Sequence, residues 1–275
     1  MFGLSRPESV IDVTRTAVLM SHYYGALPLA VHVAGGGNPT DFLGFSVDLE
    51  GERLFEAARS EARKLGYPLR TYSEFAGDTT EGIRQAAVTM RPHAVVLGLP
   101  YTFRTPAYSQ MVNAVAHDGA CPVILSRLSG AVDFRRILVL LGDQDELVLL
   151  RPLVSAFGFL GEKQITVLLC VSGGIQPGDL ARTTQELDTA AASMGFSEQA
   201  VCKVVLTESP LQTTFDGTGK HDLVVMSIGD QGIESDSCSD TLGDVIAQRI
   251  DCSILLVRGK LRSQSAEGTD SDDHA

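Results

Sequence analysis

The residues that could do chemistry in this chain are few and widely spaced. None of the six histidines stands in an H-E-x-x-H or similar metal-binding spacing. The five cysteines, at positions 121, 170, 202, 238 and 252, are odd in number and include no C-x-x-C pair, which disfavours zinc sites and disulfides. No serine lies in a G-x-S-x-G elbow, and no Cys–His pair suits nucleophilic catalysis. We therefore expect no enzyme activity, no catalytic residue, no metal and no cofactor.

The elements that would position any site are marked by an internal repeat. The first copy runs from His93 to Arg127 and the second from His221 to Arg258, each as a strand, a polar loop, a short helix and a second strand. The strands are unbroken runs of Val, Ile and Leu, which is typical of a parallel sheet covered on both faces. One α/β unit of about 130 residues thus occurs twice.

Alternating strand and helix patterns precede each copy. They predict an α/β fold of two tandem doubly wound parallel-sheet units over residues 1–130 and 131–262, followed by an acidic disordered tail over 263–275. Residues 1–4 read as the last part of a strand that should be central in its sheet. We therefore expect that the first strand of unit 1 is truncated and that the polypeptide was cut from a longer one.

The bulk composition limits the partners. A net charge of −12 disfavours nucleic acid and anionic lipid surfaces. No apolar run approaches the ~20 residues that cross a bilayer, and no signal peptide is present at the start. These features predict a soluble, cytoplasmic polypeptide.

Three segments carry a resemblance to a known family. Asp222–Met226, Leu242–Ala247 and Cys252–Val257 together resemble the second half of a universal stress protein domain. That resemblance implies a strand order of 3-2-1-4-5 in each unit, with the last strand as the usual pairing surface.

A closer resemblance is to the cytoplasmic C-terminal region of cation–chloride cotransporters and related amino-acid permeases, which is built as two stress-protein-like halves. Gly3–Ser9, Arg91–Gly98 with Tyr108 downstream, and Leu255–Gly259 carry it, in order over most of the chain. It implies a membrane domain immediately upstream in the same polypeptide.

The nucleotide-binding members of the stress protein family share a pattern G-x-x-G-x9-G-[S/T], whose backbone amides cradle phosphates. Here Gly229 and Gly232 are followed by Gly243 at a longer spacing, and Asp244 stands in place of Ser or Thr. The family's Asp after the first strand is Gly142 here, with Asp143 one place later. These glycines and Asp143 are the candidate nucleotide-binding residues, but an Asp repels phosphate, so we expect no ATP binding.

We therefore expect a non-enzymatic cytoplasmic regulatory and dimerisation domain of a membrane transporter, similar to a cation–chloride cotransporter. Its partners would be the transmembrane domain of the same polypeptide and a second copy of itself, at the cytoplasmic face of the cell membrane. The alternative is a soluble tandem universal stress protein that binds an adenine nucleotide.

Two further expectations concern architecture. The last strands, Val123–Ser126 and Ile254–Val257, should meet at a pseudo-two-fold junction, because bare apolar edges invite aggregation. The opposite edges should then be the strands around Leu69–Phe75 and Ala200–Leu206, and the second of these is the expected dimer surface.

Overall fold

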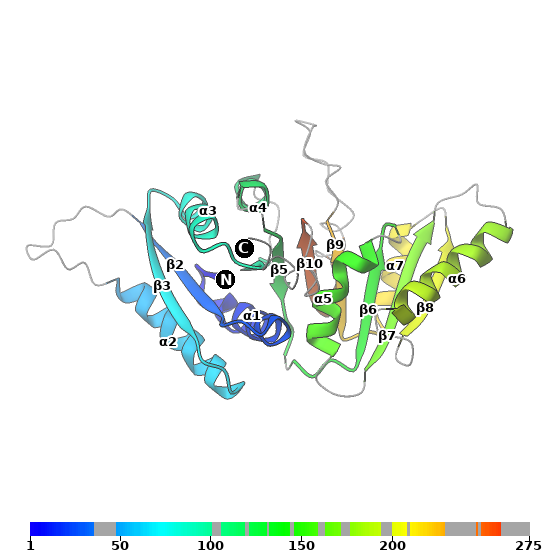
Figure 1. Ribbon diagram of the computed structural model, residues 1–275, viewed down its shortest axis with the longest axis horizontal. Helices are drawn as coiled ribbons and strands as arrows, with labels where there is room; N and C mark the ends of the chain where they lie inside the picture. The colour runs from blue at the N-terminus through cyan, green and yellow to red at the C-terminus, as the bar shows by residue number, and fades with distance from the viewer. Residues whose placement is uncertain are drawn as a thin grey trace, which may run out of the picture.

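The computed structural model describes residues 1–35, 48–100, 106–118, 121–130, 132–143, 146–158, 163–171, 177–193, 200–207, 210–228, 246 and 249–259. The tail over 263–275 and the glycines at 229, 232 and 243 lie outside the described residues. The described chain forms one sheet with helices on both faces (Figure 1).

The strands follow the apolar runs of the sequence. They are β1 (Phe2–Leu4), β2 (Leu29–Gly35), β3 (Arg70–Ala76), β4 (Val95–Gly98), β5 (Val123–Arg127), β6 (Arg136–Leu141), β7 (Gln164–Val171), β8 (Ala200–Leu206), β9 (Leu223–Ser227) and β10 (Ser253–Arg258). The helices are α1 (Val10–Tyr24), α2 (Leu49–Lys64), α3 (Thr79–Met90), α4 (Pro106–Asp118), α5 (Glu146–Gly158), α6 (Pro177–Ser193) and α7 (Pro210–Thr218).

The ten strands lie in the order β3-β2-β1-β4-β5-β10-β9-β6-β7-β8. Read from its outer strand inward to the junction, each half has the predicted order 3-2-1-4-5, and the strands within each half are parallel. The two halves join where β5 and β10 run antiparallel, with Leu125 opposite Leu256. The predicted α/β fold and the predicted meeting of the last strands are both confirmed.

The two units also share their cores. Helices α1, α2, α5 and α6 bury side chains in one apolar cluster, and α3 and α4 line a second on the other face of the sheet. Equivalent helices α1 and α5 pack against each other across the junction, beside the central strands β5 and β10 (Figure 1). Both clusters contain residues of both units, so the described side chains of unit 2 share their apolar cores with unit 1.

Strand β1 is short but central, between β2 and β4. The α-amino group of Met1 donates a hydrogen bond to the carbonyl oxygen of Ala94 at 3.1 Å. Burial at this position lowers the pKa of that amino group to about 6.

Ser5–Glu8 has the sequence pattern of a capping box but does not form one, because Pro7 opens a 3-10 turn over Pro7–Ser9 and α1 begins only at Val10. Helix α7 is short and ends at Thr218, directly before Gly219. Gly217 lies within the helix and sits against Leu138 and Leu168 in the core.

Candidate functional site

Open α/β sheets bind ligands outside the carboxyl ends of their strands, where the strand order reverses. In this fold the reversals lie between β1 and β4 in unit 1 and between β6 and β9 in unit 2. Of the candidate nucleotide residues, the described Gly142 and Asp143 follow β6 at the second of these crevices, and Gly98 with Tyr108 lies at the first.

At the unit 2 crevice the structure brings Gly142 and Asp143 to the start of α5. The Asp143 carboxylate accepts the backbone N–H of Glu146 at 3.1 Å, which is a helix cap. The Glu146 carboxylate turns back and accepts the N–H of Gly142 at 2.7 Å. The Gly142 amide, which a phosphate would approach, therefore already donates to the carboxylate of Glu146. The Asp143 carboxylate is used to cap α5. Because β6 pairs with β9, Gly142 lies beside Ile228, the last described residue before the predicted glycine pattern.

The unit 1 crevice is filled by side chains. The Tyr108 hydroxyl donates to the carbonyl oxygen of Gly98 at 2.5 Å, and burial raises the pKa of Tyr108. Ser9 lies so close that a Cβ added at Gly98 would sit 2.5 Å from the Ser9 Cβ. Gly98 is therefore needed for close packing of the η1 turn on β4, and the crevice holds Tyr108 and Ser9 where a ligand would lie.

A buried His–Asp pair lies at the same edge of unit 1 and was missed by the sequence reasoning. His32 Nδ1 lies 2.9 Å from the carbonyl oxygen of Leu4, and its Nε2 lies 2.9 Å from the Asp48 carboxylate. The other Asp48 oxygen caps α2 by accepting the N–H of Gly51 at 2.9 Å. A Cβ at Gly51 would lie 2.4 Å from Asp48 Oδ2, so only glycine allows this approach. No local spacing connects His32 with Asp48.

The contacts of this pair are those of a structural, not a catalytic, arrangement. A carbonyl oxygen can only accept, so Nδ1 donates to Leu4, and Nε2 faces the Asp48 carboxylate. No serine, threonine or cysteine side chain is recorded in contact with His32 among the described residues. The described chain also holds no cluster of three or more His, Cys, Asp or Glu side chains placed to bind a metal.

The described cysteines form no disulfide with one another and are buried or half-buried. Burial, together with a hydrogen bond to Asp188, raises the pKa of Cys202 to about 12. Burial also raises the pKa of Cys252. A raised pKa keeps a thiol protonated and weakly nucleophilic, so neither of these two cysteines suits covalent catalysis.

Comparison with known proteins identifies the fold. No family model and no curated protein matches the chain. Among solved structures, the cytoplasmic domain of a prokaryotic cation chloride cotransporter has a TM-score of 0.62 at 9% identity and covers 96% of each chain. A protein of Pseudomonas aeruginosa UCBPP-PA14 assigned to the universal stress proteins has a TM-score of 0.61 at 14% identity, covering 93% of this chain and 90% of that one.

A universal stress protein from Archaeoglobus fulgidus DSM 4304 is also similar, with a TM-score of 0.53 at 13% identity, covering 93% of this chain and 94% of that one. The chain therefore has a tandem universal stress protein-like fold. No described helix is both long and apolar enough to cross a membrane.

Proposed function

We propose that this chain is a non-enzymatic regulatory and dimerisation domain at the cytoplasmic face of a membrane transporter of the cation–chloride cotransporter kind. The observation that carries the proposal is the occupation of both carboxyl-edge crevices by the chain's own groups. Glu146 takes the Gly142 amide in one, and Tyr108 with Ser9 fills the other. The likeness to the cotransporter domain over 96% of both chains supports it.

The second candidate is a soluble tandem universal stress protein that binds an adenine nucleotide. The likeness to two stress protein structures favours it, since their TM-scores are close to that of the cotransporter domain. The chemistry of the crevice separates the two candidates. A carboxylate on the phosphate-facing amide must be displaced before an anion can bind, and its charge repels the incoming phosphate.

The outer strand β8 supports the dimerisation role. Val201 and Leu206 expose 57% and 48% of their surface on the last strand of the sheet. Helix α6 packs on β8, whereas among the described residues α7 packs mainly on β6 and β7. An apolar outer strand with free backbone groups is a template for pairing with another chain, and a symmetric pair is the commonest outcome.

A calorimetric titration with magnesium and ATP tests the choice between the two functions. The transporter-domain proposal expects heats equal to those of buffer dilution. A saturable isotherm with a micromolar dissociation constant would overturn it in favour of the stress protein. Glu146→Ala is the informative variant, because it removes the carboxylate that accepts the Gly142 amide. If this variant binds ATP and the wild type does not, Glu146 is the group that prevents nucleotide binding in this crevice.

A further inference from the structure

The edge of the sheet opposite to the crevices, at the amino ends of the strands, differs between the two units. In unit 2 this edge is closed by ion pairs and caps. The Asp222 carboxylate accepts the backbone N–H groups of Arg135 and Arg136 at 3.0 and 2.9 Å and the Arg136 guanidinium at 2.8 Å. Nearby, the Lys163 ammonium, whose side chain is only 1% exposed, lies 3.0 Å from Asp133.

Unit 1 has no acid at the equivalent place. His93 corresponds to His221 in the repeat, so Ala94 stands where unit 2 has Asp222. A cavity of about 780 Å³ lies at this edge, around the first residues of β1 to β4 and the last residues of α1 and α3. Its lining includes Arg59, Arg70, Arg91 and His93 but no Asp or Glu.

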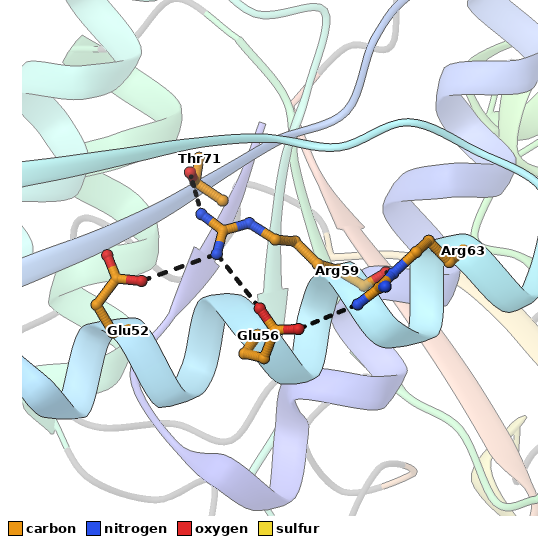
Figure 2. A network of polar contacts seen from close by, with 5 residues as sticks. All are labelled: Glu52, Glu56, Arg59, Arg63 and Thr71. Carbon is orange, nitrogen blue, oxygen red and sulfur yellow. Dashed lines mark hydrogen bonds and ion pairs between the residues drawn. The ribbon is translucent and has the colours of Figure 1, made fainter.

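The three arginines are not equivalent. Arg59 is already neutralised, because its guanidinium lies 3.8 Å from Glu52 and 3.5 Å from Glu56 and donates to the Thr71 hydroxyl at 3.0 Å (Figure 2). Arg70 and Arg91 are exposed, and within the described residues neither guanidinium has an ion-pair or hydrogen-bond partner. The cavity thus carries two uncompensated positive charges in a chain whose net charge is −12.

The backbone holds Arg91 in an unusual conformation. Its φ of 45° is the only positive value at a non-glycine residue in the described chain, and it ends α3 by donating its N–H to the Ala87 carbonyl. A left-handed conformation is strained for an arginine because of its Cβ, and a glycine would avoid that strain. The position therefore keeps a charged side chain at a place where glycine would stabilise the turn.

The remaining walls are apolar and aromatic. The Tyr24 and His93 rings stack with centroids 4.8 Å apart and planes 22° apart. Leu27 and Met90 also line the cavity and are 50% and 39% exposed. Tyr72 also lines the cavity, and a hydrogen bond from its hydroxyl to the Glu74 carboxylate raises the pKa of that tyrosine. A ligand with an apolar body and an anionic group could contact the apolar walls and pair with the arginines at the same time.

We propose that this cavity at the amino edge of unit 1 binds an organic phosphate, with the phosphate on Arg70 and Arg91 and the apolar body against the Tyr24–His93 wall. Guanidinium groups offer two parallel donors to phosphate oxygens, and two of them balance a dianion. The volume is that of a typical small-molecule site. The inference does not depend on the transporter role and concerns the edge opposite to the closed crevices.

The phosphate could belong to a soluble metabolite or to a lipid head group. The net charge of −12 opposes approach to an anionic bilayer, so we expect the soluble source. Phenyl phosphate is a suitable soluble probe, because it joins a dianionic phosphate to an aromatic body. Phosphatidylcholine vesicles that contain phosphatidic acid probe the lipid source.

The test is calorimetric titration of the full chain with phenyl phosphate. We expect saturable binding that weakens as salt is added, and a loss of about tenfold or more in affinity for the Arg70→Gln, Arg91→Gln double variant. The double Lys variant keeps the charges and should retain most of the affinity. Arg182→Gln is the matched control, since Arg182 is an arginine 69% exposed on α6, far along the chain.

Binding of phenyl phosphate without binding of the vesicles identifies a soluble ligand. Cosedimentation with the phosphatidic acid vesicles alone identifies a lipid head group. Either result supports the proposal if the Arg70→Gln, Arg91→Gln double variant no longer binds that probe. Binding of neither probe overturns the proposal. So does equal binding by the wild type and a Gln double variant with an unchanged circular dichroism spectrum.

Discussion

Asp48 and Asp78 are both helix caps, but their surroundings differ. Each caps a helix by accepting the N–H three residues later at 2.9 Å, but only Asp48 also faces a buried histidine. Loss of a helix cap typically costs about 1 kcal/mol. Loss of Asp48 additionally leaves Nε2 of His32, which is 9% exposed, without the carboxylate that lies 2.9 Å away.

We therefore expect Asp48→Ala to lower the free energy of unfolding by about 2–3 kcal/mol and Asp78→Ala by only about 1 kcal/mol. Urea unfolding followed by circular dichroism measures both. Equal costs for the two variants would mean that the His32 contact contributes nothing.

Glu61 is a buried acid with two cationic partners. Its carboxylate lies 2.6 Å from Arg15 Nε and 2.9 Å from Lys64 Nζ, and its side chain is 4% exposed. Burial alone would raise its pKa, but the hydrogen bonds from Lys64 and Arg15 outweigh burial and lower it. Arg15 also donates to the carbonyl of Gly130 in the connection between the units.

A lowered carboxyl pKa stabilises the fold above pH 4.5, its usual value, and that contribution disappears as the pH falls through the lower, folded-state value. We expect Glu61→Gln to cost about 1–3 kcal/mol at pH 7, a gap that narrows below about pH 4. Glu56→Gln is the control, because Glu56 is 64% exposed on the same helix and its pairs with Arg59 and Arg63 contribute little (Figure 2). A gap that stays constant from pH 7 to acid would contradict the account.

At the scale of elements, periodicity was the reliable guide. Unbroken apolar runs predicted the central strands, and the repeat predicted that β5 and β10 would meet, because burial on both faces leaves a parallel-sheet strand little freedom. Local pattern was less reliable at Ser5–Glu8, where Pro7 opens a 3-10 turn in place of the capping box that the residue types suggest. The His32–Asp48 pair could not be predicted, since its members meet only through the tertiary fold.

The packing of α1 on α5 couples the two units. Leu150 on α5 is fully buried in the apolar cluster that contains residues of both units. Removing such a side chain to Ala costs about 2–5 kcal/mol. All six tyrosines lie in the first 130 residues and the chain has no tryptophan, so tyrosine fluorescence reports on unit 1 alone.

We expect Leu150→Ala in unit 2 to shift the tyrosine transition of unit 1 in urea by as much as it shifts the circular dichroism of the whole chain. The coincidence follows from the shared cores, which make one cooperative unit. A tyrosine transition unmoved by the variant would show that the units unfold independently.

At the scale of the whole molecule, both outer strands of the sheet expose apolar side chains. Helix α3 packs on β3 and α6 packs on β8, and β8 exposes Val201 and Leu206. Phe75 on β3 is 64% exposed, so it provides a matched control at the other end of the sheet. A charged side chain added to a strand that forms the dimer interface would lose its hydration when the strands pair, so it should prevent dimerisation.

Light scattering of the full chain at micromolar concentration tests the dimerisation role most directly. The account predicts twice the chain mass of 29.4 kDa for the wild type and for Phe75→Glu, and 29.4 kDa for the Val201→Glu, Leu206→Glu double variant. A wild-type mass of 29.4 kDa that does not change on concentrating the sample, or a dimer that survives the β8 substitutions, would contradict it.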